Sequence, residues 1–161
     1  MYKDCNILSP LLDLPYDISN DDCIMWLYQI YNEVYKENPI MFKSKEVWMR
    51  ESPQINNMDE SFLHLLCGFE CKRVYEERAV RLLWTKDIIE NEPCIHNCDC
   101  EKIFLWRVKN KVKLYLKKHR YIIILKDNNR YWSFVTGYYV MDSHYHKKLC
   151  KEYHDCKTKN A

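Results

Sequence analysis

The chain of 161 residues is long enough for one compact domain, and its composition excludes several classes of protein. It holds only two glycines, Gly68 and Gly137, whereas phosphate loops of the Walker or dinucleotide type need several glycines close together. No apolar run approaches the ~20 residues of a membrane span, and the start MYKDCNILSP lacks the apolar stretch of a signal peptide. We therefore expect a cytoplasmic protein with no membrane contact.

Charge is distributed unevenly along the chain. Residues 1–60 hold 11 acidic and 5 basic side chains, and residues 61–161 hold 12 acidic and 20 basic ones. Between Glu101 and Arg120 there are eight Lys or Arg and one acid. This segment predicts a basic surface for a polyanion, although a solvated sheet face explains it equally well. The nine cysteines, an odd number with no export signal, favour reduced thiols over a disulfide framework.

The first half of the chain predicts helices. Asn20 or Asp21 can cap a helix whose apolar residues recur at helical spacing. Residues 40–49 are compatible with one or two short strands, and a polar loop follows them. A long helix is expected over residues 72–90, because apolar residues supply a buried side along this segment.

The second half predicts an antiparallel sheet. Short links join four segments rich in β-formers, at residues 102–109, 112–118, 121–126 and 131–142. Residues 143–155 predict a closing helix. The expected fold is α+β, with N-terminal helices, an antiparallel meander of four or more strands and a C-terminal helix. We place a boundary at residue 60, between an acidic helical addition (1–60) and the α+β domain (61–161).

A cysteine-rich loop offers a candidate metal site. Four side chains of types that bind soft metals fall within seven residues, at Cys94, His96, Cys98 and Cys100. Zinc prefers tetrahedral sets of thiolates and imidazoles, which favours a zinc site here. One loop rarely wraps a metal at spacings of two and four, so an unliganded loop is the alternative.

The strand at residues 131–142 carries Thr136 and Gly137 within an apolar run. A glycine inside a strand marks a bulge or a place where a ligand or another backbone comes close. The Thr136 hydroxyl needs a partner if it is buried, and a phosphate or a structural group would serve equally. Strict alternation would place one set of side chains on a single face: Trp132, Phe134, Thr136, Tyr138 and Val140.

Three further side chains invite a functional interpretation. His64 lies in an apolar patch, where a lone histidine is more often structural than catalytic. Arg78 and Arg81 lie three residues apart and share one face of the predicted helix. Two guanidinium groups placed in this way can hold a phosphate, or they can pair with Glu76 or Glu77 instead.

Four segments, taken in order, resemble the phage-associated nucleases of the barnase–EndoU–colicin–RelE-like superfamily. They are FLHLLCG, EERAVRLLWTKDIIEN, YIIILKDNNRYWSFVTGYYV and HKKLCKEY, and the resemblance covers roughly residues 61–153. Cys67 interrupts the family's Leu-Leu-Gly, and Leu83 stands where proline is common. The resemblance implies a ribonuclease domain over residues 61–161 that needs no metal or other cofactor.

The chemistry that the resemblance implies is attack of the RNA 2′-hydroxyl on its adjacent phosphate. Such a reaction needs a base, an acid and cations at the phosphate. His64 would act as base or acid, and Arg78 and Arg81 would stabilise the phosphate. Thr136 would hydrogen-bond a phosphate oxygen, and Tyr138 is a candidate for the second proton-transfer group.

Substrate binding is assigned to basic and aromatic residues around this site. Basic residues would steer RNA by charge, and Trp106, Tyr115 and Tyr131 would stack on bases. The full set is Lys86, Trp106, Lys109, Lys111, Lys113, Tyr115, Lys117, Arg120 and Tyr139.

A nuclease of this kind would be a toxin or a phage-linked effector, so an antitoxin, immunity or host target protein is an expected partner beside RNA. The alternative is a catalytically inert, phage-encoded inhibitor or binding protein that acts on a host protein or nucleic acid. A third interpretation is a zinc-stabilised interaction module. A nuclease should gather His64, Arg78, Arg81 and Thr136 in one cleft, whereas an inert protein should disperse them.

Overall fold

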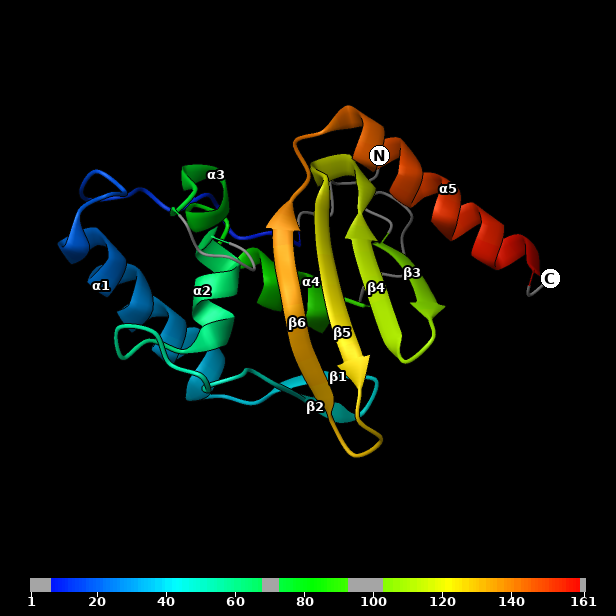
Figure 1. The fold of residues 1–161 in the computed structure, drawn as a ribbon. Coiled ribbons are helices and arrows are strands. Elements are labelled where there is room, and N and C mark those ends of the chain that lie inside the picture. Colours follow the sequence, from blue (N-terminus) through cyan, green and yellow to red (C-terminus); the bar gives the residue numbers. More distant parts are fainter. Residues whose placement is uncertain (1–6, 68–72, 93–102, 160–161) are drawn as a thin grey trace, which may run out of the picture.

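The computed structural model describes residues 7–67, 73–92 and 103–159, and its fold is α+β (Figure 1). The first half contains α1 (Asp21–Tyr31), the π-helical turn η1 (Asn32–Lys36), β1 (Ile40–Phe42), β2 (Lys45–Trp48), α2 (Glu60–Cys67), α3 (Glu76–Ala79) and α4 (Trp84–Glu90). The second half contains β3 (Ile103–Val108), β4 (Lys111–Leu116), the 3-10 turn η2 (Lys117–His119), β5 (Tyr121–Asp127), β6 (Trp132–Tyr139) and α5 (Ser143–Lys159).

Six strands form one mixed sheet in the order β1-β2-β6-β5-β4-β3. The predicted antiparallel meander is confirmed for β3 to β6. β2, however, pairs with β6 in parallel, with Val47 opposite Trp132. The strands β1 and β2, which precede the expected boundary at residue 60, therefore belong to the same sheet as β3 to β6, and the buried residues of α1 belong to the same core.

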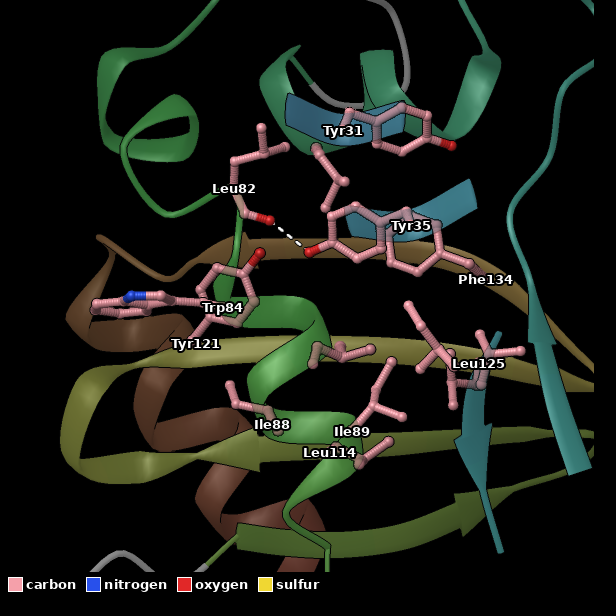
Figure 2. Packing of buried hydrophobic residues seen from close by; sticks show 14 of the residues in the cluster. Tyr31, Tyr35, Leu82, Trp84, Ile88, Ile89, Leu114, Tyr121, Leu125 and Phe134 are labelled. Carbon is pink, nitrogen blue, oxygen red and sulfur yellow. Dashed lines mark hydrogen bonds between the residues drawn. The ribbon is translucent and has the colours of Figure 1, made fainter. Parts of the chain in front are cut away.

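The long helix expected over residues 72–90 is interrupted. Between α3 and α4 the chain makes tighter bonds, from the Arg81 N–H to the Arg78 carbonyl and from the Leu82 N–H to the Ala79 carbonyl (both 3.1 Å). This turn buries Leu82, whose carbonyl accepts a 2.5 Å hydrogen bond from the Tyr35 hydroxyl (Figure 2). A core contact between distant segments thus overrides the local helical pattern.

Gly137 allows α4 to pack closely on β6. A Cβ atom at this position would lie 2.6 Å from Oγ1 of Thr85 and 3.3 Å from the hydroxyl of Tyr121. These two hydroxyls lie 2.9 Å apart in the core and bond to each other. The close approach that the glycine permits is therefore made by a helix of the same chain rather than by a ligand.

A β-bulge at Val135 changes which side chains of β6 share a face. Ile124 pairs with Thr136, but Leu125 pairs with Phe134, so Val135 has no partner in the ladder. The expectation that Phe134 and Thr136 face the same way is therefore wrong. Phe134 packs in the core with the N-terminal helices, whereas Tyr138, which shares a face with Thr136, packs beside α5.

The second face of the sheet is covered in part by α5. Leu149 and Tyr153 of α5 are buried against the strand residues Phe104, Trp106, Tyr115 and Ile122 and against Val140, which follows β6. The predicted C-terminal helix is confirmed and extends to Lys159. Among the described residues, no helix is long and apolar enough to cross a membrane.

Candidate functional site

Arg78 reaches into a pocket of about 540 Å³ at the C-terminal end of β6. Its guanidinium carbon lies 4.7 Å from the ring centre of Tyr138, and its Nη1 donates a 3.1 Å hydrogen bond to the backbone carbonyl of His64. Burial lowers the pKa of this guanidinium. The lining residues are Cys67, Tyr75, Glu77, Arg78, Tyr138, Tyr139, Val140, Met141, Asp142 and Tyr145.

Arg81 contacts the opposite face of the same strand. Its guanidinium carbon lies 4.1 Å from the ring centre of Tyr139, and its Nη1 donates a 2.6 Å bond to the carbonyl of Glu77. Tyr138 and Tyr139 are neighbours in a strand, so their rings lie on opposite faces of the sheet. Each guanidinium group is therefore engaged by a tyrosine of β6 and by a backbone carbonyl, and both lie near enough to the Tyr121 hydroxyl for their charges to oppose the rise in its pKa that burial causes.

His64 and Thr136 are not among the residues that line this pocket, although the backbone carbonyl of His64 accepts the hydrogen bond from Arg78. Nε2 of His64 lies 3.6 Å from a carboxylate oxygen of Glu60, one turn earlier on α2. Burial lowers the pKa of His64, and the neighbouring Glu60 carboxylate opposes that shift. Of the five predicted catalytic residues, only Arg78 and Tyr138 line the pocket.

Several residues of this pocket were not predicted from the sequence. Tyr145 accepts a 3.1 Å hydrogen bond from the hydroxyl of Tyr138, whose pKa is raised mainly by burial. A signal for Tyr145 was present, because Tyr145, Leu149 and Tyr153 recur every four residues and mark the buried stripe of α5. Glu77 belongs to the short helix α3, and Tyr75, Met141 and Asp142 lie in connections between elements, where no hydrophobic period marks a residue in advance.

Two predicted base-stacking residues are buried and cannot serve in that role. Tyr115 is fully buried, and its hydroxyl lies 2.5 Å from Nδ1 of His146. Trp106 is only 4% exposed, and its Nε1 donates to Glu152 at 3.0 Å. Their rings pack against α5. The alternation along each strand predicts which residues share a face, but it does not predict that a helix covers that face.

The predicted basic residues divide by their partners. Lys113 pairs with Glu152 at 2.6 Å, and Lys86 on α4 pairs with Glu90 at 3.2 Å. Lys109 lies exposed in the β3–β4 turn. Lys117 and Arg120 line a second pocket, beside α5.

The half of the sheet face beyond α5 presents an open row of side chains. Lys111 pairs with Lys126, Lys126 with Ser133, and Ser133 with Trp48, so these four residues share one face. Trp48 is 50% exposed and stacks on Tyr131, with ring centres 3.9 Å apart. In Figure 1, α5 lies at the upper right of the sheet, away from the lower ends of β4, β5 and β6.

The metal hypothesis falls on residues that the structure does not describe, because Cys94, His96, Cys98 and Cys100 all lie outside the described residues. Within the described ranges there is no group of three or more side chains able to hold a metal ion. Cys67 is disulfide-bonded, so the expectation of reduced thiols is wrong for this residue, whereas Cys23, Cys150 and Cys156 are free cysteines.

Comparisons with protein-family models, with curated proteins and with solved structures find no match to this chain. The resemblance to the nuclease superfamily therefore stays a prediction.

Proposed function

We propose that the protein binds single-stranded RNA on the open half of the sheet. The observation that carries this proposal is the row of Lys111, Lys126 and Trp48, the last stacked on Tyr131. The row crosses β4, β5, β6 and β2, which at ~4.8 Å per strand makes it roughly 14 Å long.

The chemistry of the row fits a nucleic-acid strand. An exposed indole gives a π-face on which any base can stack, and stacking of this kind contributes ~1–3 kcal/mol per base. Neither Lys111 nor Lys126 has a carboxylate partner among the described residues, so both charges are available to phosphates. Together these groups favour binding that tolerates many sequences.

The experiment compares binding of an unstructured, fluorescently labelled RNA by the wild type and by Trp48→Ala. We expect Trp48→Ala to weaken binding about tenfold, in line with the loss of one stacked base. Met25→Ala is the matched control, because Met25 on α1 is similarly exposed, at 55%, and lies outside the row. Equal affinity of the wild type and a folded Trp48→Ala protein would overturn the proposal.

A metal-independent ribonuclease is the second candidate, and the Arg78–Tyr138 pocket favours it. A half-buried guanidinium among tyrosines could stabilise a phosphate during attack by the 2′-hydroxyl. The test is RNA cleavage in EDTA by the wild type, His64→Ala and Arg78→Ala. If the protein is a ribonuclease, the wild type should cleave RNA and both substitutions should reduce cleavage. A wild type that cleaves none of a varied set of RNAs, tRNA included, would exclude this function.

A further inference from the structure

A second pocket, of about 340 Å³, lies between the β4–β5 connection and α5. It is lined by Phe104, Lys117, Lys118, Arg120 and His146. The connection is closed by a left-handed residue, since Arg120 has φ 54° and its N–H bonds to the carbonyl of Lys117 at 3.2 Å. The carbonyl of Arg120 in turn accepts a 2.7 Å bond from the N–H of Val140. These backbone bonds fix the turn that carries the cations.

The pocket gathers positive charge. No carboxylate among the described residues lines it, and none of them forms an ion pair with Lys117 or Arg120. The guanidinium group of Arg120 donates to the Ser143 hydroxyl at 3.4 Å. Lys118 has interactions elsewhere, and the other charged or polar side chains of the pocket are Lys117, Arg120 and His146.

His146 is held in place beside these cations. Its Nδ1 lies 2.5 Å from the hydroxyl of Tyr115, and its Nε2 lies 3.9 Å from Sγ of Cys150. Burial raises the pKa of Tyr115 to about 12, so the hydroxyl stays protonated at neutral pH and can donate to the ring. The pKa of His146 is lowered by burial first, and then by the positive charges of Arg120, Lys117 and Lys147.

We propose that this pocket binds a phosphomonoester. Lys117 and Arg120 supply two permanent positive charges, and His146 is a third hydrogen-bond donor. Two fixed cations match the charge of a phosphate dianion better than that of a phosphodiester, which carries one negative charge. The ligand is the terminal phosphate of an RNA or a free phosphate compound. The site is separate from the open row of the sheet, and inorganic phosphate alone can test it.

The test is an NMR titration of His146 in the full chain, with and without inorganic phosphate. A bound dianion favours the imidazolium, so we expect phosphate to raise the pKa of His146 by about one unit. The double variant Lys117→Gln/Arg120→Asn should lose this response, and asparagine also accepts the left-handed backbone of position 120. Lys157→Gln, which removes an exposed charge near the far end of α5, should keep it.

Two outcomes would overturn the site. One is a His146 pKa that phosphate does not change, and the other is an equal change in the wild type and in a folded double variant. Lys117→Gln alone, with its ordinary backbone, provides the same comparison if the double variant does not fold. It should reduce the response to phosphate.

A pair of RNA oligomers, with and without a 5′-phosphate, identifies the source of the ligand. Tighter binding of the phosphorylated oligomer, lost in the double variant, supports an RNA terminus. Equal binding of both oligomers, with the His146 response intact, supports a free phosphate compound. Trp48→Ala should leave the phosphate response unchanged, which separates a failure of this site from a failure of the RNA-binding proposal.

Discussion

Two pairs of cations in this molecule share the same spacing and differ in their surroundings. Arg78 and Arg81 lie three residues apart, as do Lys117 and Arg120. The guanidinium groups of the first pair lie over tyrosine rings and donate to backbone carbonyls of the same chain. In the second pair, the Lys117 ammonium lies 5.9 Å from the ring centre of Phe104 and the Arg120 guanidinium lies 3.4 Å from the Ser143 hydroxyl, and among the described residues neither side chain donates to a backbone carbonyl. Spacing alone therefore does not identify a phosphate site, because internal partners decide whether a cation is available.

Gly137→Ala tests how closely the strand beneath the first pair is packed. The new methyl group would meet Oγ1 of Thr85, so we expect unfolding free energy to fall by about 2–3 kcal/mol in chemical denaturation. Thr85→Ala in the same chain removes that oxygen and should recover part of the loss. Strictly additive effects of the two substitutions would contradict the proposed steric conflict.

Arg81→Ala and Lys117→Gln test directly whether the two pairs of cations differ in structural role. We expect Arg81→Ala to lower unfolding free energy by about 1–2 kcal/mol, because a partly buried cation–π contact and a hydrogen bond are lost. Lys117→Gln should stay within about 0.5 kcal/mol of the wild type, as is usual for exposed sites. Equal losses in urea denaturation would show that the two pairs do not differ in structural role.

The salt dependence of RNA binding tests the charges of the open row. Each phosphate contact made to a single strand contributes about 0.7 to the slope of log affinity against log salt. The double variant Lys111→Gln/Lys126→Gln should therefore reduce the slope by about 1.4. Lys86→Gln is the control, because Lys86 pairs with Glu90 on α4 and should leave the slope unchanged.

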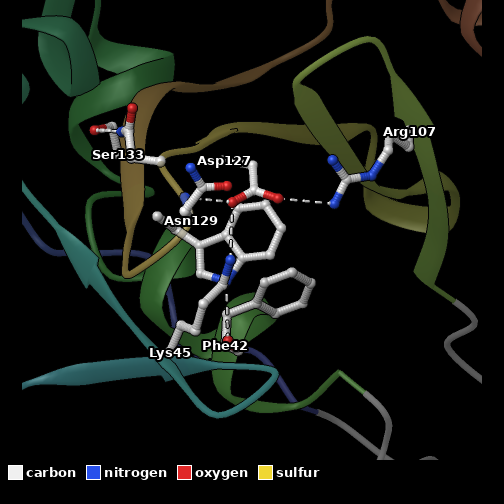
Figure 3. Close-up of polar contacts among 8 residues, drawn as sticks. Phe42, Lys45, Arg107, Asp127, Asn129 and Ser133 are labelled. Atoms are coloured by element: carbon white, nitrogen blue, oxygen red, sulfur yellow. Dashed lines mark hydrogen bonds and ion pairs between the residues drawn. The ribbon is translucent and has the colours of Figure 1, made fainter.

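The smallest expected effect concerns Asp127, which engages two basic residues outside the proposed sites (Figure 3). Hydrogen bonds from Lys45, the Asn129 N–H and Arg107 lower the pKa of Asp127 to about 2. Because the folded-state pKa lies below the ordinary value of 3.8, this contribution to stability is present above about pH 4 and is lost as pH falls toward 2.

Asp127→Asn should remove this part of the acid sensitivity. The measurement compares the thermal stability of the two proteins at pH 5 and pH 2.5, and the difference between them should shrink at the lower pH. A constant difference across this range would contradict the assignment to Asp127.

Signals that act within a few residues were sufficient to predict several elements. Asn20 caps α1 by accepting a 2.8 Å bond from the Asp22 N–H, and Asn129 adopts φ 67° in the β5–β6 turn, as expected for asparagine. The four C-terminal strands and α5 were predicted from their local patterns and are confirmed. These features depend on side chains close in sequence, so the sequence by itself determined them.

Long-range packing decided the rest. The bulge at Val135 separates Thr136 from the face of Phe134. Residues 40–49 form the short strands that their sequence predicted, but no local pattern indicated that β2 would pair in parallel with β6. Contacts with distant residues also determined which cations are engaged: β6 supplies the rings that hold Arg78 and Arg81. The sequence alone determined where charge and aromatic side chains occur, and only the tertiary structure decided which of them remain available to a ligand, because burial and pairing depend on segments far apart in the chain.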